Sequence, residues 1–123
     1  MEGQDILWGL TDQDPEERVR EKVFSLIGDI RFMPVATVNH GQPECRILDF
    51  NRLSNGEIYF MTSKGKPTYL QLKDRPQLVL NTLIQERYSL RMSAWAEEEK
   101  DAKIWEEFFI LNPGTKLMYR KNF

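Results

Sequence analysis

Five short strand-like runs, separated by turn signals, constrain the fold of this chain more than any other feature. They are rich in β-branched and apolar residues and lie at 33–39, 44–50, 57–62, 77–84 and 88–97. The run 77–84 is almost continuously apolar, which predicts a central strand covered on both faces, whereas 88–97 alternates between apolar and polar residues. No β-α-β alternation connects the runs. We therefore expect a mainly β fold, an antiparallel β-barrel or strongly curled sheet with flanking helices.

Three helices are predicted beside these strands, at about 14–29, 66–75 and 104–111. The first has Asp14 as its cap and Pro15 at the first helical position, and it ends at Gly28 or soon after. The second opens at Lys66 and Pro67, and a proline-glycine pair stops the third. A chain of 123 residues is about one domain, so we expect a single domain, 1–123, with residues 1–13 as an N-terminal extension.

The composition excludes several classes of function. The net charge is −2 with both signs interspersed, so the broad positive field of a nucleic-acid binder is missing. No apolar run has the length of a membrane span, and the acidic N-terminus lacks the order of a signal peptide. One cysteine and one histidine leave no disulfide and no cluster for a zinc ion. We expect a cytoplasmic protein whose lysines serve a small anionic ligand, with a solvated lysine face as the alternative.

The segment 58–67 runs from a strand through a hydroxyl- and lysine-bearing turn into a helix. Thr62, Ser63, Lys64 and Lys66 there, together with free amides at the helix N-terminus, form a candidate phosphate site. Upstream, Arg46 lies in a strand-like run and can grip a phosphate with two hydrogen bonds. The alternatives are an ordinary strand-to-helix turn, a solvated Lys66 and a cross-strand ion pair for Arg46.

Four other side chains are interpreted as structural and not as part of the binding site. Cys45 is expected to point to the sheet face opposite Arg46 and to pack in a core. His40 lies in a turn and is expected to be exposed to solvent. Trp95 and Trp105 are expected in a core or a dimer interface.

Taken in order, the segments resemble the pyridoxamine 5′-phosphate oxidase-like superfamily of FMN-binding split β-barrels, which are usually homodimers. The resemblance covers about residues 16–112. Its motifs are 33–38 (MPVATV), 40–43 (HGQP), 45–48 (CRIL), 59–64 (YFMTSK) and 72–76 (LKDRP). It implies a split antiparallel β-barrel that binds FMN at the interface between two copies of the chain.

The resemblance also assigns roles to residues. It implies that Arg46, Thr62, Ser63 and Lys66 hold the FMN phosphate, with Lys64 as a further candidate. The backbone around Ile47, Leu48 and Met61 would then lie along the isoalloxazine ring.

Two departures from the superfamily narrow the expected function. Its members generally continue into a further strand beyond the position of Phe123. True pyridoxamine-phosphate oxidases also carry a C-terminal arginine segment that has no counterpart here. Pyridoxamine-phosphate oxidation is therefore not expected, and the flavoproteins of the general-stress and nitroimidazole-resistance types are the nearer comparison.

Three functional hypotheses follow from the resemblance. The first is an FMN-dependent oxidoreductase that passes electrons from NAD(P)H to a small organic acceptor, with the redox chemistry supplied by the flavin. The second is a non-catalytic flavin- or haem-binding carrier or sensor, for which His40 is the only candidate haem ligand among the histidines. The third is an unliganded structural dimer.

Overall fold

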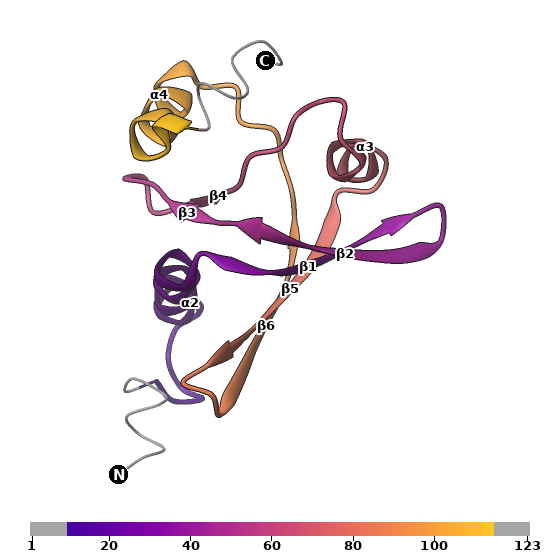
Figure 1. The fold of residues 1–123 in the computed structure, drawn as a ribbon. Coiled ribbons are helices and arrows are strands. Elements are labelled where there is room, and N and C mark those ends of the chain that lie inside the picture. The colour runs from indigo at the N-terminus through magenta and orange to yellow at the C-terminus, as the bar shows by residue number, and fades with distance from the viewer. Residues whose placement is uncertain (1–9, 115–123) are drawn as a thin grey trace.

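The structure is a computed structural model that describes residues 10–114 (Figure 1). Its elements in chain order are α2 (Glu16–Ile30), β1 (Phe32–Asn39), β2 (Gln42–Asp49), β3 (Asn51–Arg52), β4 (Ile58–Tyr59), α3 (Pro67–Asp74), β5 (Gln77–Ile84), β6 (Tyr88–Trp95) and α4 (Ala102–Leu111). The expected mainly antiparallel sheet with flanking helices is confirmed. Within residues 10–114, no helix has the length and apolar character needed to cross a membrane.

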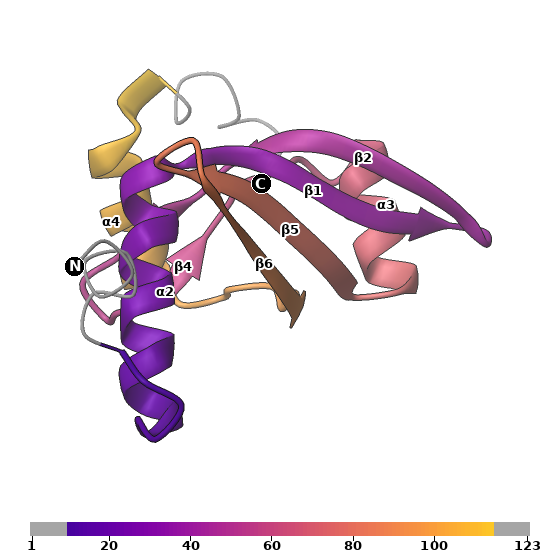
Figure 2. The same ribbon diagram turned by 90° about the horizontal axis from the view of Figure 1, so that it is seen from below.

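Four strands form one antiparallel sheet in the order β2-β1-β5-β6, and β3 and β4 form a separate two-stranded ladder. The β1–β2 hairpin pairs residues continuously from Phe32 opposite Asp49 to Asn39 opposite Gln42. β5 joins the two halves of the sheet, since it pairs with both β1 and β6. Helices α2 and α3 lie at opposite ends of the long strands, as Figure 2 shows from a second direction.

One face of the four-stranded sheet carries the core. Inward-pointing residues alternate along the strands with outward-pointing ones, as the side-chain period of a strand requires. Six buried residues form the central cluster: Ile27, Met33, Val35, Phe50, Leu78 and Leu80. Apolar residues of α2, β2, β4, α3 and β6, together with Phe60, pack around this cluster.

The opposite, outer face of the sheet is exposed in the described chain. We define the outer face by its apolar residues Phe32, Ile47, Val79, Leu83 and Trp95. The prediction that β5 lies in the middle of the sheet is confirmed, but the prediction that it is covered on both faces is wrong for this chain. An apolar run shows that a strand has two apolar faces, and it does not show what covers each of them.

Two local predictions were also wrong. The expected strand 57–62 is regular only at Ile58–Tyr59, where it pairs with Asn51–Arg52, because the following residues extend without a ladder partner. Asp14 does not cap α2. Its carboxylate instead accepts a hydrogen bond from the Thr11 amide at 2.6 Å and one from Arg18 at 3.3 Å, and Pro15 is the residue at the cap position.

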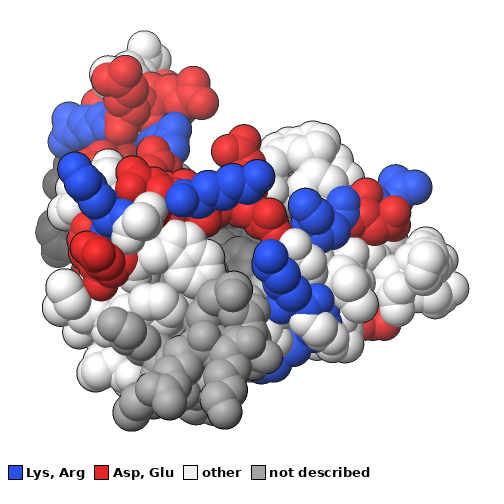
Figure 3. Space-filling view, turned by 90° about the horizontal axis from the view of Figure 1, so that it is seen from above, with Lys and Arg blue, Asp and Glu red and all other residues white. Residues whose placement is uncertain are grey.

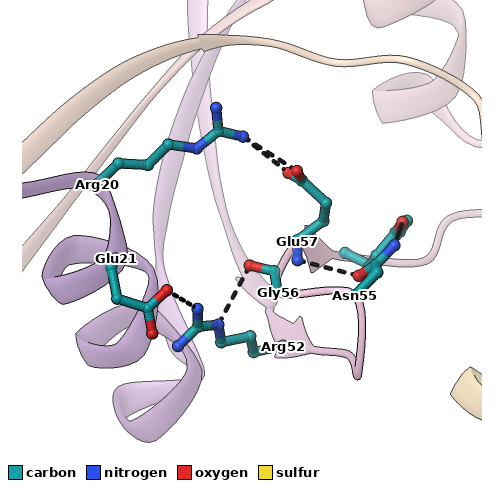
Figure 4. Close-up of polar contacts among 7 residues, drawn as sticks. Arg20, Glu21, Arg52, Asn55, Gly56 and Glu57 are labelled. Carbon is teal, nitrogen blue, oxygen red and sulfur yellow. Dashed lines mark hydrogen bonds and ion pairs between the residues drawn. The ribbon is translucent and has the colours of Figure 1, made fainter. Parts of the chain in front are cut away.

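Ion pairs join α2 to the β3–β4 hairpin (Figure 4). Arg20 donates to Glu57 at 2.9 Å, and Arg52 donates to Glu21. Arg52 also donates to the Gly56 carbonyl at 3.1 Å, which ties the arginine to the turn that connects the two short strands. The hairpin is therefore held close against the helix.

This close contact predicts the effect of a substitution at Gly28 on α2. A Cβ at this position would lie 2.9 Å from the Arg52 Cβ, which cannot move aside as the end of a side chain can. Alanine would favour the helix by about 1 kcal/mol, but overpacking typically costs about 1–3 kcal/mol. We expect Gly28→Ala to lower the free energy of unfolding in urea by about 1 kcal/mol. Gly65→Ala, at a turn position where nothing in residues 10–114 lies within 4 Å of the added Cβ, is the control and should not lower it.

Candidate functional site

The turn before α3 offers hydroxyls, lysines and open amides in one place. Lys66 donates its amide to the Ser63 carbonyl at 3.0 Å, which closes the turn. Ser63 is buried and Thr62 half-buried, whereas Lys64 and Lys66 are exposed. Among the residues that the structure describes, no side chain caps the N-terminus of α3. The first-turn amides of the helix therefore remain available to an anion, which the helix dipole also favours.

Arg46 lies on the inward face of β2 and is held by three oxygen atoms. Its Nη1 donates to the Thr37 hydroxyl at 2.6 Å and to the Val35 carbonyl at 3.3 Å. Its Nη2 donates to Gln71 Oε1 at 2.9 Å. Because Gln71 belongs to α3, these contacts join the arginine to the helix that begins at the turn.

Glu44 completes this polar cluster. Its carboxylate accepts a hydrogen bond from Asn39 at 2.9 Å and one from Gln71 Nε2 at 2.7 Å, and it lies 3.8 Å from Arg46 Nη2. The hydrogen bond from Asn39, then that from Gln71 and the nearby positive charge, hold the pKa of Glu44 below its usual range. The carboxylate is therefore ionised at neutral pH. Glu44 is on the same strand as Arg46, so this ion pair is not the cross-strand pair considered as the alternative to the phosphate role.

One edge of the Arg46 guanidinium is available to bind a phosphate. An arginine has five N–H groups, and the three hydrogen bonds above use both on Nη1 and one on Nη2. The Nε–H and the second Nη2 N–H make no hydrogen bond with residues 10–114, and the side chain is 22% exposed. This is the edge through which arginine binds a phosphate with two parallel bonds. Gln71 lies four residues after Pro67, or about 6 Å along the helix axis, so Arg46 contacts the middle of the short helix that begins at the turn.

The remaining predicted site residues are divided between two surfaces. Ile47 points to the outer face and is exposed, whereas Leu48 points inward and packs against the core. Met61, Thr62 and Lys64 line an open cleft of about 1320 Å³ between the inner face of the sheet, the segment around β4, and α4. The lining of this cleft does not include Arg46, Ile47, Leu48, Ser63 or Lys66.

The floor of the cleft is apolar and its rim carries both charges. Phe60, Met92 and Phe108 are among the floor residues, and the rim includes four basic and four acidic side chains. Figure 3 shows basic and acidic groups interspersed on one face of the molecule, in keeping with the absence of a single-sign field. The cleft therefore provides apolar surface without a charge preference.

Sequence reasoning missed several polar groups. Gln71, a partner of Arg46, is 25 residues away and belongs to none of the motifs, and Thr37, the other partner, lies in the motif 33–38 but was given no role there. Tyr69 and Glu98 are hydrogen-bonded at the rim of the cleft, which raises the pKa of the Tyr69 hydroxyl and lowers the pKa of Glu98. No sequence signal joins positions so far apart, because the contacts arise only when α3 packs beside the sheet.

The four structural interpretations had mixed outcomes. Cys45 does point away from Arg46, but it is exposed, so the prediction of core packing was wrong. His40 is exposed as expected. Trp95 is on the outer face, while Trp105 is partly buried and donates its ring N–H to the Glu99 carbonyl at 2.6 Å. The part of the chain that the structure describes has no group of three or more His, Cys, Asp or Glu side chains that could hold a metal ion.

Comparison with known proteins identifies the family. A family model described as pyridoxamine 5′-phosphate oxidase matches residues 19–119, most of the chain. The chain belongs to this family, and the resemblance drawn from its motifs is confirmed. A search of curated proteins gives no significant match.

Solved structures share the fold at low sequence identity. A NimC/NimA family protein from Clostridium acetobutylicum is 16% identical with a TM-score of 0.71, over 83% of this chain and 71% of that protein. General stress protein 26 from Bacillus anthracis Sterne is 17% identical with a TM-score of 0.65, over 80% and 75% of the two chains. A pyridoxamine 5′-phosphate oxidase-related, FMN binding protein from Nostoc punctiforme is 17% identical with a TM-score of 0.51, over 89% and 58%.

Proposed function

We propose that this protein is a flavoprotein that binds FMN through its phosphate. The observation that carries the proposal is the free Nε/Nη2 edge of Arg46, whose guanidinium is held by Gln71 of α3, the helix whose N-terminus has no side-chain cap among residues 10–114. A phosphate with a charge of about −1.5 to −2 would meet one guanidinium and the lysines and hydroxyls of the turn. Family membership and the FMN binding described for the Nostoc protein support the same ligand.

The residues proposed to hold the phosphate are Arg46, Thr62, Ser63, Lys64 and Lys66. The backbone of Ile47, Leu48 and Met61 is proposed to lie along the flavin ring. When bound, FMN supplies hydride and single-electron transfer, so the protein itself contributes binding and orientation. We propose an oxidoreductase that passes electrons from NAD(P)H to a small organic acceptor. NAD(P)H turnover above that of free FMN separates this activity from a carrier or sensor role.

We further propose that the protein is a cytoplasmic homodimer with a closed split barrel and the flavin at the interface between the protomers. The outer face supports self-association, because several large apolar side chains are exposed on it, and exposed apolar surface often marks an interaction site. Ile47 belongs to the outer face and is adjacent in sequence to Arg46. A second chain packed on this face would therefore contact β2, the strand whose opposite face carries Arg46.

A comparison of two ligands tests the phosphate assignment. We expect Arg46→Ala and Lys66→Ala each to weaken FMN binding about 10- to 100-fold, because a hydrogen bond to a charged group is worth about 1.5–3 kcal/mol. Riboflavin, which has no phosphate, should change less than about threefold. Fluorescence titration measures both affinities. The control is Arg75→Ala, which removes an exposed arginine from the other end of α3 and should change neither. Equal losses for FMN and riboflavin would contradict the assignment.

A further inference from the structure

We infer that Thr37 and Gln71 are positioning residues that orient Arg46 toward the phosphate. This inference rests on the proposed function, since it concerns how the same site binds its ligand. Neither residue is proposed to touch the phosphate. Both accept hydrogen bonds from N–H groups of Arg46, and without these hydrogen bonds the guanidinium would be free to turn.

The hydrogen bonds around Gln71 fix the orientation of its amide. Oε1 accepts from Thr37 Oγ1 at 2.6 Å and from Arg46 Nη2 at 2.9 Å, while Nε2 donates to Glu44 at 2.7 Å. If the amide were flipped, its NH₂ group would face the N–H of Arg46 and the hydroxyl of Thr37, and its oxygen would face the Glu44 carboxylate. Only the observed orientation therefore satisfies the hydrogen bonds of the cluster. Gln71 is 6% exposed, and an unsatisfied group at this depth is unfavourable.

Thr37 completes the control of the guanidinium. Its hydroxyl accepts from Arg46 Nη1 and uses its own proton on Gln71, so it links two members of the cluster. It is buried beneath them on β1. With both Nη1 N–H groups and one on Nη2 engaged, the Nε/Nη2 edge is the part of the guanidinium left for a ligand. The arginine is thereby held in one orientation before the ligand arrives, which reduces the entropy lost on binding.

Gln71 also connects Arg46 to the turn. The same helix that holds the guanidinium through Gln71 carries Lys66 and the open amides at its N-terminus. A shift of α3 would therefore move the turn and the arginine together. Gln71 therefore contributes to the spacing between the two halves of the phosphate site, together with the packing of Leu72 against the core.

Matched variants at Thr37 test the inference. We expect Thr37→Val, which keeps the shape and removes the hydroxyl, to weaken FMN binding about three- to tenfold, the worth of one hydrogen bond. Thr37→Ser keeps the hydroxyl and should restore most of the FMN affinity. Gln71→Met should weaken FMN about as much as Thr37→Val. Riboflavin affinity should stay unchanged in all three, which also reports that the fold is intact.

A double-mutant cycle separates positioning from a merely structural role. In an Arg46→Ala protein, Thr37→Val should cause no further loss of FMN affinity, because the group that it orients is gone. The same loss with and without Arg46, or an equal loss for riboflavin, would overturn the inference while leaving the proposed function in place. If the wild-type protein does not prefer FMN to riboflavin, the proposed function fails and the inference fails with it.

Discussion

Leu80→Ala is expected to lower the free energy of unfolding by about 3–4 kcal/mol, within the range for a leucine truncated in a packed core. Leu80 is fully buried on β5, and it is paired with Val35 of β1 and Met92 of β6. Its side chain therefore lies at the centre of the cluster that joins all the large elements. Removing it loses apolar contact and leaves a cavity that two paired strands cannot close. Urea denaturation followed by tryptophan fluorescence measures the loss.

The matched control for Leu80 is Leu70→Ala on α3. Leu70 is 58% exposed, so the same truncation should change the free energy of unfolding by less than about 0.5 kcal/mol. Similar losses at the two positions would show that the inner face of the sheet is not the core. A loss only at Leu70 would contradict the packing of β5 altogether.

The order of strands was readable because alternation and turn residues are local signals. β5 was predicted with its observed bounds, and the inward residues of β6 were those of the predicted apolar face. Gly56 adopts a positive φ of 83° in the turn between β3 and β4, where Asn55-Gly56 is one of the turn signals that separate the strand-like runs. Each of these features depends on neighbours a few residues apart, which is the range over which sequence patterns carry information.

The sequence did not predict which face of each strand is covered by another element. Cys45 and Arg46 were correctly placed on opposite sides of β2, but the side that lacked a covering element was misjudged. The partners of Arg46 were also missed, since Thr37 is 9 residues away and Gln71 is 25 residues away on another element. Such contacts depend on the packing of α3 against the sheet, and a pattern along the chain does not report it.

The outer face leads to the second large expected effect, which is on self-association. We expect the wild-type protein to be a dimer and Leu83→Glu to be a monomer, with the dimer dissociation constant raised at least about 100-fold. A carboxylate buried at a contact between two sheets loses its hydration, and such a loss is worth several kcal/mol. Leu83 is 61% exposed on β5, so the substitution should not disturb the fold of a single chain. Sedimentation velocity over a range of concentrations measures the change.

The control for this experiment is Ile110→Glu, which introduces the same charge at an exposed aliphatic position of α4, away from the outer face. It should leave the dimer intact. A monomeric wild-type protein, or a Leu83→Glu protein that stays dimeric, would contradict the outer face as the contact.

FMN affinity provides an independent readout of the same variant. Because the flavin is proposed to lie between the protomers, Leu83→Glu should weaken binding of both FMN and riboflavin, whereas Arg46→Ala should weaken FMN alone. The two variants therefore separate the contribution of the partner chain from that of the phosphate site.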